Sequence, residues 1–508
     1  MKGHNGQNEG SPLEMEGMTQ AREILTRNVE RVRSAGAGYA DARYFADDSS
    51  EVLVLYDGNL EANDTGFETG VGVRVLWGGA WGFAATSDLA AIDSCFDLAV
   101  RNAQTAAGLV KVPLRMGEMP AHKSYFQSPV GTDPVAVPLG DKLDLLAGID
   151  ARLKEDWILR RVVVANFTRR HQLFVNSDGT DVEKRLTNVF ADMIVMALDG
   201  DSEMQRRSMS LYTTGGGTRG WEMMLDPELF SGHAERIKSE LSELVKAEPL
   251  EYGRRSVILL PGQTFLQVHE TIGHPLELDR ILGYELSFAG GSFVTLDSIG
   301  RLRYGSEKLN VSSFGGIENS PGSFGFDDEG TPERDYLLID RGVLVNVLSS
   351  RAMVNEANDR AGRRVLEQSG GAARATAFYR APIDRMTNVN ILPGADGSLE
   401  DIVASTADGI VVDNPTSWSI GSNREHFHFG CEIAWEVKDG RRTRVLRNPT
   451  YQGHTLEFYN SLTAVGDAST WRLMQVDNCG KGEPNQIMQL GHGVPVVRFD
   501  NVITGERG

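Results

Sequence analysis

The sequence contains few cysteines, no long apolar run and too few basic residues to balance its acidic ones. Its three cysteines, Cys95, Cys431 and Cys479, are too few and too widely spaced for a disulfide framework, which is typical of a protein from a reducing compartment. No segment approaches the roughly 18 consecutive apolar residues of a membrane-spanning helix, and the first ten residues lack the apolar core of a signal peptide. We therefore expect a cytoplasmic protein that does not enter a membrane.

The charge balance and the length limit the classes of function and fold. Lys and Arg number 51 against 70 Asp and Glu, which gives a formal net charge of −19. Because the binding of nucleic-acid phosphates needs a basic surface, this charge argues against nucleic acid as the main partner. A chain of 508 residues exceeds one ordinary hydrophobic core, so two or three domains are expected. No repeat of 20–50 residues occurs, which excludes a solenoid.

One stretch combines the residue types of a hydrolytic metal site. His269 and His274 can both bind a metal ion, and Glu270 is placed to take a proton from a metal-bound water. The familiar metallopeptidase helix has its two histidines four residues apart. Here they are five apart, and a regular α-helix would turn them away from each other by roughly 140°. We therefore expect a π-bulge, because Gly273 makes the distortion cheap and Pro275 cannot donate a regular helical hydrogen bond.

Such a site needs a third protein ligand, and the sequence offers two sources. His426 and His428 alternate on a predicted strand with Cys431 nearby, although a polar strand face that lines a substrate cleft would show the same pattern. Cys479 lies in a predicted glycine-rich loop beside Lys481, whose charge favours the thiolate form. Two imidazoles and one thiolate would leave a fourth coordination position open to water, as in catalytic zinc sites. Residue types and spacing alone do not decide which of these two sources supplies the third ligand.

Hydrophobic periodicity and turn signals predict an α+β protein. Residues 1–15 are predicted to be a disordered tail, and residues 16–247 an N-terminal α/β layered region that could divide into two subdomains near 112–138. Residues 248–508 are predicted to form a large antiparallel β-rich domain that carries the His-Glu-x-x-x-His helix.

Individual elements follow from the same signals. Tight turns are expected at 57–58 and 78–79, a loop at 215–217, and a strand within 314–328. Asp226 is the predicted N-cap of a helix. The main predicted helices cover 18–34, 90–107, 139–153, 227–247 and 264–276.

Several motifs occur in one order along nearly the whole chain. They are residues 70–75 with 81–84, 269–279, 322–330, 385–388 with 392–394, and 479–481 followed by 497–502. Together these motifs resemble the TldD/PmbA family of modulators of DNA gyrase, on the TldD side. The resemblance implies a zinc metallopeptidase with His269, His274 and Cys479 as the Zn²⁺ ligands and Glu270 as the general base. It also implies a dimer, formed with a second copy or with a PmbA/TldE-like paralogue that lacks the metal motif.

Three residues depart from the family pattern near the expected site. Leu278 stands where the family usually has glycine, His454 where it tends to have asparagine, and His492 where small residues are more usual. These departures leave the identity of the substrate open. The candidate substrate or oxyanion contacts are His454, His492, His426, His428 and Arg385.

Three functions are compatible with these residues. The first is zinc-dependent hydrolysis of short or unfolded peptides with Glu270 as general base. The alternatives are a zinc-dependent tailoring hydrolase that acts on a peptide-like natural product, and a non-catalytic peptide-binding subunit. The glycine-rich segment 312–325 could pair with an extended peptide by strand addition or form an ordinary hairpin.

Overall fold

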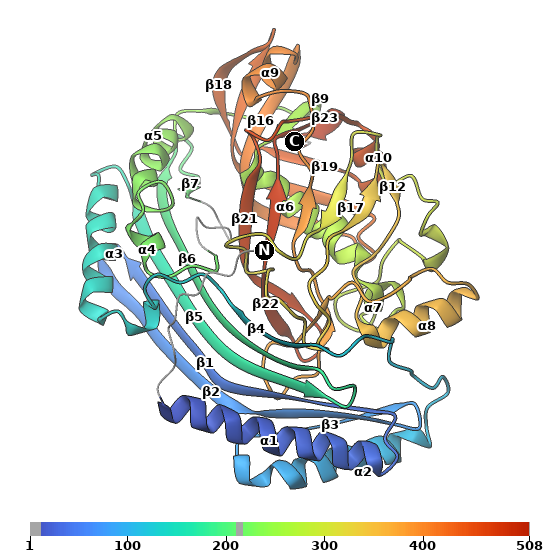
Figure 1. The fold of residues 1–508 in the computed structure, drawn as a ribbon. Helices are drawn as coiled ribbons and strands as arrows, with labels where there is room; N and C mark the ends of the chain where they lie inside the picture. Colours follow the sequence, from blue (N-terminus) through green and yellow to red (C-terminus); the bar gives the residue numbers. More distant parts are fainter. Residues whose placement is uncertain (1–11, 210–216, 507–508) are drawn as a thin grey trace.

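The computed structural model describes residues 12–209 and 217–506 (Figure 1). The fold is α+β with mainly antiparallel sheets, as predicted. A seven-stranded sheet occupies the N-terminal half in the order β3-β2-β1-β5-β6-β4, with β7 paired to β6. Its strands are β1 (Tyr39–Tyr56), β2 (Asn59–Trp77), β3 (Ala80–Thr86), β4 (Lys123–Gln127), β5 (Arg160–Asn176), β6 (Asp181–Leu198) and β7 (Met204–Ser208).

Helices bury the apolar face of this sheet in two separate cores. The helices α1 (Pro12–Ser34) and α2 (Ile92–Ala107) pack together against β1, β2 and β3, around buried Leu25, Phe96 and Val73. The helices α3 (Leu139–Leu153) and α5 (Ala234–Leu244) pack against β5 and β6 at the other end. A short helix, α4 (Glu222–Leu225), joins this second core.

The C-terminal half is built on an eight-stranded sheet. Its order is β16-β9-β23-β19-β17-β18-β8, with β20 paired to β23. Because β16 also pairs with β17, five of these strands close into a barrel, which leaves them without free edges. The strands are β8 (Glu248–Pro249), β9 (Gly253–Leu259), β16 (Asp408–Ile420), β17 (His426–Lys438), β18 (Arg441–Arg447), β19 (Thr450–His454), β20 (Leu462–Val465) and β23 (Val497–Thr504).

Smaller elements surround this barrel. A four-stranded sheet has the order β12-β11-β10-β15, and β13-β14 and β21-β22 are two-stranded. These strands are β10 (Val311–Ser313), β11 (Tyr336–Asp340), β12 (Val343–Leu344), β13 (Ala373–Arg374), β14 (Ile383–Asp384), β15 (Val389–Ile391), β21 (Arg472–Lys481) and β22 (Gln486–Val494). The helices are α6 (Pro261–Val268), α7 (Leu278–Ile281), α8 (Arg351–Ala361), α9 (Leu399–Ala404) and α10 (Thr455–Asn460).

Several sequence predictions are confirmed. The helix over 139–153 has the predicted bounds. The turns at 57–58 and 78–79 join β1 to β2 and β2 to β3, and their residues have positive φ angles, as tight hairpin turns require. The strands β1 and β5 are each continuous through a stretch of polar residues.

Other predictions are wrong. Residues 12–15, placed in the tail, belong to α1, while 1–11 lie outside the described residues. The helix predicted over 227–247 contains an α-helix only from Ala234, so Asp226 is not its N-cap. No strand forms within 314–328. Of the loop predicted at 215–217, residues 215–216 lie outside the described part, and Gly217 forms a β-bridge with Val189.

One of the two alternatives for residues 312–325, the addition of a peptide as an extra strand, is wrong for β10 (Val311–Ser313). This strand pairs with β11 on one side and β15 on the other. Both rows of backbone hydrogen-bonding groups are therefore occupied, and a peptide cannot add to either edge of β10. The predicted boundary at 247/248 stays a prediction.

Candidate metal centre

The two histidines lie where α6 changes its winding. After Val268 the helix continues as a π-helical turn (His269–Gly273) and then as a short 3-10 turn (His274–Leu276). The backbone N–H of His274 donates to the carbonyl of His269, five residues earlier, which is the π-helical hydrogen bond. The predicted bulge is confirmed. Gly273 has a negative φ, and its need for glycine is steric: a Cβ there would meet Met386 Sδ at 2.0 Å.

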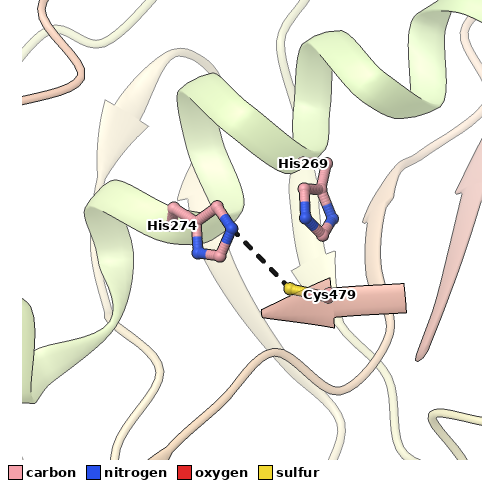
Figure 2. A group of neighbouring side chains, drawn as sticks. All are labelled: His269, His274 and Cys479. Atoms are coloured by element: carbon pink, nitrogen blue, oxygen red, sulfur yellow. Dashed lines mark hydrogen bonds between the residues drawn. The ribbon is translucent and has the colours of Figure 1, made fainter. Parts of the chain in front are cut away.

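Cys479 approaches this turn from the hairpin β21–β22, which packs against α6. One ligand atom from each of His269, His274 and Cys479 lies within 4.8 Å of the others, and all three side chains are buried (Figure 2). Cys479 Sγ is 3.7 Å from His274 Nε2. Tetrahedral zinc with ordinary bond lengths holds a nitrogen and a sulfur ligand roughly 3.5 Å apart. The spacing therefore fits a metal ion between these groups.

Cys479 is on a strand, which corrects the predicted loop. It pairs with Met488, and the register of the hairpin shifts between Val476 and Cys479. The glycines around Cys479 led to the loop prediction. In the structure Cys479 lies in β21, whose pairing partner β22 begins only a few residues later. Nothing in the local sequence indicated that the two segments pair.

A chain of hydrogen bonds fixes the free nitrogen of His269. His492 Nδ1 lies 2.7 Å from the Val389 carbonyl oxygen, which can only accept, so this nitrogen carries a proton. Burial lowers the pKa of both His492 and His269, that of His269 to about 4, so both rings are neutral. His492 Nε2 must then accept from His269 Nδ1, at 2.9 Å. The lone pair of His269 is consequently on Nε2, free to bind a metal ion.

A carboxylate orients His274 in the same way. Glu277 Oε2 lies 3.1 Å from His274 Nδ1, which therefore carries a proton and leaves Nε2 as the free nitrogen facing Cys479. Burial lowers the pKa of His274, which keeps the ring neutral. A ligand histidine that donates its second N–H to a carboxylate or carbonyl is the usual arrangement at protein metal sites.

Arg385 supports the thiolate form of Cys479. Burial alone would raise the pKa of this thiol, but the pKa lies below its ordinary value, and the nearby positive charge of Arg385 is the largest of the effects that lower it. The cation is Arg385 and not the predicted Lys481, because the Lys481 ammonium is paired with Glu277 at 3.2 Å and Asp279 at 2.6 Å. A thiolate is the form of cysteine that binds metals.

Two predicted substrate contacts have other roles. Arg385 is fully buried and donates to the carbonyls of Cys479 and Gln486. His492 is fully buried and uses both ring nitrogens within the protein. Both side chains are closed to solvent in this structure, and a contact of either with a substrate stays a prediction.

The remaining predicted contacts lie on the surface of the barrel. His426 and His454 are exposed and face each other across β17 and β19, with ring centroids 6.0 Å apart. His428 is half-buried, two residues further along the same face of β17. A contact of these three histidines with a substrate stays a prediction.

Sequence reasoning missed Arg424, which contacts Glu270. Arg424 Nη1 donates to Glu270 Oε2 at 2.6 Å, and Nη2 donates to the Ala289 carbonyl. Arg424 lies in the turn between β16 and β17 and has a positive φ of 66°. No motif marks this arginine, because 154 residues separate it from Glu270 and only the pairing of β16 with β17 brings the turn to the site.

Three family models match the chain in order. Residues 40–103 match the PmbA/TldA metallopeptidase domain 1, residues 132–246 the central domain, and residues 253–505 the C-terminal domain. The chain belongs to the PmbA/TldD metallopeptidase family. The resemblance inferred from the motifs is confirmed.

Curated relatives extend over nearly the whole chain. A metalloprotease of Methanothermobacter thermautotrophicus is 27% identical over 467 residues, covering 92% of this chain and 95% of the relative. A TldD-homologue metalloprotease of Haemophilus influenzae is 25% identical over 493 residues, covering 92% of each chain. At the level of the family, this chain is therefore similar to proteins named as metalloproteases.

Solved structures share the fold. A candidate modulator of DNA gyrase from Thermotoga maritima superposes with a TM-score of 0.72 at 16% identity, covering 95% of this chain and 99% of the other. TldE from Thermococcus kodakarensis superposes with a TM-score of 0.67 at 15% identity, covering 95% and 100%. None of the helices in the described residues is both long and apolar enough to cross a membrane.

Proposed function

We propose that this chain is a zinc-dependent peptidase that hydrolyses short or unfolded peptides. The proposal rests on one observation: one ring nitrogen each of His269 and His274 and the sulfur of Cys479 converge within 4.8 Å. These are three protein ligands of the types that zinc prefers, which leaves a fourth position for water. The metalloprotease names of the relatives support the same chemistry.

In the proposed reaction, zinc would supply a Lewis acid and lower the pKa of a bound water. Glu270 accepts the proton of the attacking water on a carboxylate oxygen and delivers it to the nitrogen of the leaving amine. Arg424 holds Glu270 Oε2 in position through the 2.6 Å ion pair. Glu277 and His492 keep His274 and His269 in the tautomers that the reaction needs.

The resemblance to the TldD/PmbA family implies a dimer as the working form. We propose a homodimer or a heterodimer with a PmbA/TldE-like paralogue. His426, His428 and His454 are the proposed substrate contacts, since they gather on one barrel surface beside the turn that carries Arg424.

Metal analysis combined with peptide cleavage tests the function. The protein, purified without chelators together with any partner, is expected to contain about one zinc per chain, as a three-ligand site predicts. It is expected to cleave a mixture of short peptides, to lose this activity on chelation, and to regain it with zinc. A protein that holds zinc yet cleaves neither peptides nor an unfolded protein would contradict the proposal.

Replacing His492 tests the hydrogen-bond chain behind His269. In His492→Phe the ring size is kept but the acceptor for His269 Nδ1 is lost, so we expect zinc affinity to fall about 10- to 100-fold. A competition titration with a chromophoric chelator measures this. His454→Phe is the matched control, because His454 is exposed and its replacement should leave the affinity unchanged. Equal affinities for both variants would show that His492 does not position His269.

A further inference from the structure

Arg374 is half-buried, and one edge of its guanidinium group is open. Its Nη1 donates to the Met386 carbonyl at 3.2 Å, and its guanidinium carbon lies 4.9 Å from the centroid of the Phe324 ring. Nε and Nη2 have no hydrogen-bond or ion-pair partner among the described residues, and neither atom is closed to solvent. Two parallel N–H donors are therefore available on a guanidinium that is held in place.

The same edge binds a carboxylate in two other arginines of this protein. Nε and Nη2 of Arg74 donate to Asp41, and those of Arg170 donate to Asp48. Parallel N–H donors on this edge match the two oxygens of a carboxylate. Arg374 forms no ion pair with any described residue, so its edge is free for a carboxylate from outside the chain.

The carboxylates whose charges act on Arg374 are hydrogen-bonded elsewhere. Asp328 accepts from Gln172, Lys184 and a backbone N–H. Glu333 accepts from a backbone N–H as well. Neither carboxylate pairs directly with Arg374, although both interact with its charge over a longer distance.

Positive charge exceeds negative charge around Arg374. Arg43 is fully buried near Asp328 and, like Arg374, forms no ion pair with a described residue. Burial lowers the pKa of Arg374 to about 10, and the like charge of Arg385 adds to this effect. Arg374 still carries its charge at neutral pH, so an anion at its open edge would be stabilised.

Arg374 lies close to the metal centre. The carbonyl that it binds belongs to Met386, whose side chain packs against Gly273 in the π-helical turn between the two ligand histidines. The negative charge of Cys479 also acts on Arg374 and opposes the lowering of its pKa. Arg374 is therefore placed to contact a ligand that occupies the metal centre.

We propose that Arg374 binds a carboxylate group of the substrate through its open Nε–Nη2 edge, so that the protein prefers peptides with a carboxylate at this position. The inference rests on the proposed peptidase function, because it takes the ligand of the site to be a peptide. The carboxylate comes from an acidic side chain or from the C-terminus of the peptide, and both present the same two oxygens. Met386 and Phe324 hold the guanidinium before the ligand binds, which reduces the entropic cost of binding.

Two matched pairs of peptides test the proposal on the full-length protein. The first pair is Nα-acetyl-trialanine as the free acid and as the C-terminal amide. The second pair is the amides of Nα-acetyl-Ala-Glu-Ala and Nα-acetyl-Ala-Gln-Ala. Titration calorimetry on zinc-loaded Glu270→Gln protein is expected to show that the acid of one pair binds about 10- to 100-fold more tightly than its neutral partner, as charge-assisted hydrogen bonds predict.

The pair that shows this preference identifies the source of the carboxylate. Equal affinities within both pairs, or no binding of any probe at millimolar concentration, would overturn the proposal. Because Glu270→Gln removes the proposed base, binding is measured whether or not the parent cleaves peptides. A failure of the carboxylate preference is therefore distinct from a failure of the proposed hydrolysis.

Variants show whether Arg374 is the partner of the carboxylate. Arg374→Gln should bring the two peptides of the preferred pair to within about twofold of each other, because the charge and the paired donors are lost. A preference that survives in this variant would place the carboxylate elsewhere, for example on the metal ion, and refute the proposal. Arg363→Gln is the matched control and should keep the preference, since Arg363 is exposed and donates only to the backbone carbonyls of Leu296 and Ile299.

A second variant covers the case in which Arg374→Gln does not fold, which circular dichroism and thermal melting report. Arg374→Lys keeps the positive charge but loses the two parallel donors, so the preference should fall at least about threefold. An unchanged preference in folded Arg374→Lys protein would equally contradict a carboxylate bound at the Nε–Nη2 edge.

Discussion

Glu270→Gln is expected to lower kcat for peptide cleavage by about 10²- to 10⁴-fold while zinc stays bound. The amide has nearly the shape of the carboxylate but cannot take a proton from water, and general bases contribute rate factors of that size. Glu270 is not among the three converging ligand groups, so the zinc content should match that of the parent. Steady-state kinetics on a fluorogenic peptide, with metal analysis on the same sample, measures both quantities.

The neighbouring Glu425 provides the control for this prediction. Glu425 directly follows Arg424, and its carboxylate lies near the exposed His426, so Glu425→Gln changes the charge near the site without touching the proposed base. Glu425 is half-buried and accepts from the Asn423 backbone N–H, and the glutamine keeps an oxygen for this hydrogen bond, so we expect its kcat to stay within about twofold of the parent. A Glu270→Gln protein that retains zinc and cleaves as fast as Glu425→Gln would remove Glu270 from the mechanism.

The metal centre could be predicted from the sequence because its chemistry is concentrated in one short stretch. The spacing of His269 and His274 demanded a π-bulge, and the structure has one. The reason is local: Pro275 has no N–H to donate, so the regular helical hydrogen bond to the Thr271 carbonyl cannot form. For Cys479, residue type and spacing left alternatives, and the motifs of the family selected it.

The residues around the ligands could not be predicted, because long-range packing assigns them. His492 and Arg385 were candidate substrate or oxyanion contacts, because a His or an Arg can stabilise an oxyanion. In the fold, β22 places His492 against His269, and Arg385, directly after β14, donates to the backbone carbonyl of Cys479. Arg424 reaches Glu270 only because β16 and β17 pair over their full length. Local periodicity carries no information about such contacts.

The same long-range packing makes Glu277 a residue whose loss should strongly affect the fold. This carboxylate is fully buried among three cations and a histidine: Lys481 Nζ at 3.2 Å, Arg280 Nε at 3.5 Å, Arg385 Nε at 4.0 Å and His274 Nδ1 at 3.1 Å. Although burial alone raises the pKa of Glu277, the charge of Lys481 and the hydrogen bond from His274 hold it well below its ordinary value. Glu277 is therefore ionised and balances cations that have little access to water.

Glu277→Ala is expected to destabilise the protein by about 3 to 5 kcal/mol, because it leaves buried cations without their partner. It should also weaken zinc binding about 10- to 100-fold, because His274 loses the acceptor that orients it. Denaturant unfolding of metal-free protein and a chelator competition separate the two effects. Glu277→Gln keeps the acceptor but not the charge, so it should lose stability and retain most of the zinc affinity. If Glu277→Gln lost as much zinc affinity as Glu277→Ala, the hydrogen-bond acceptor would not explain the effect on zinc binding, and a Glu277→Gln protein as stable as the parent would show that the charge does not explain the effect on stability.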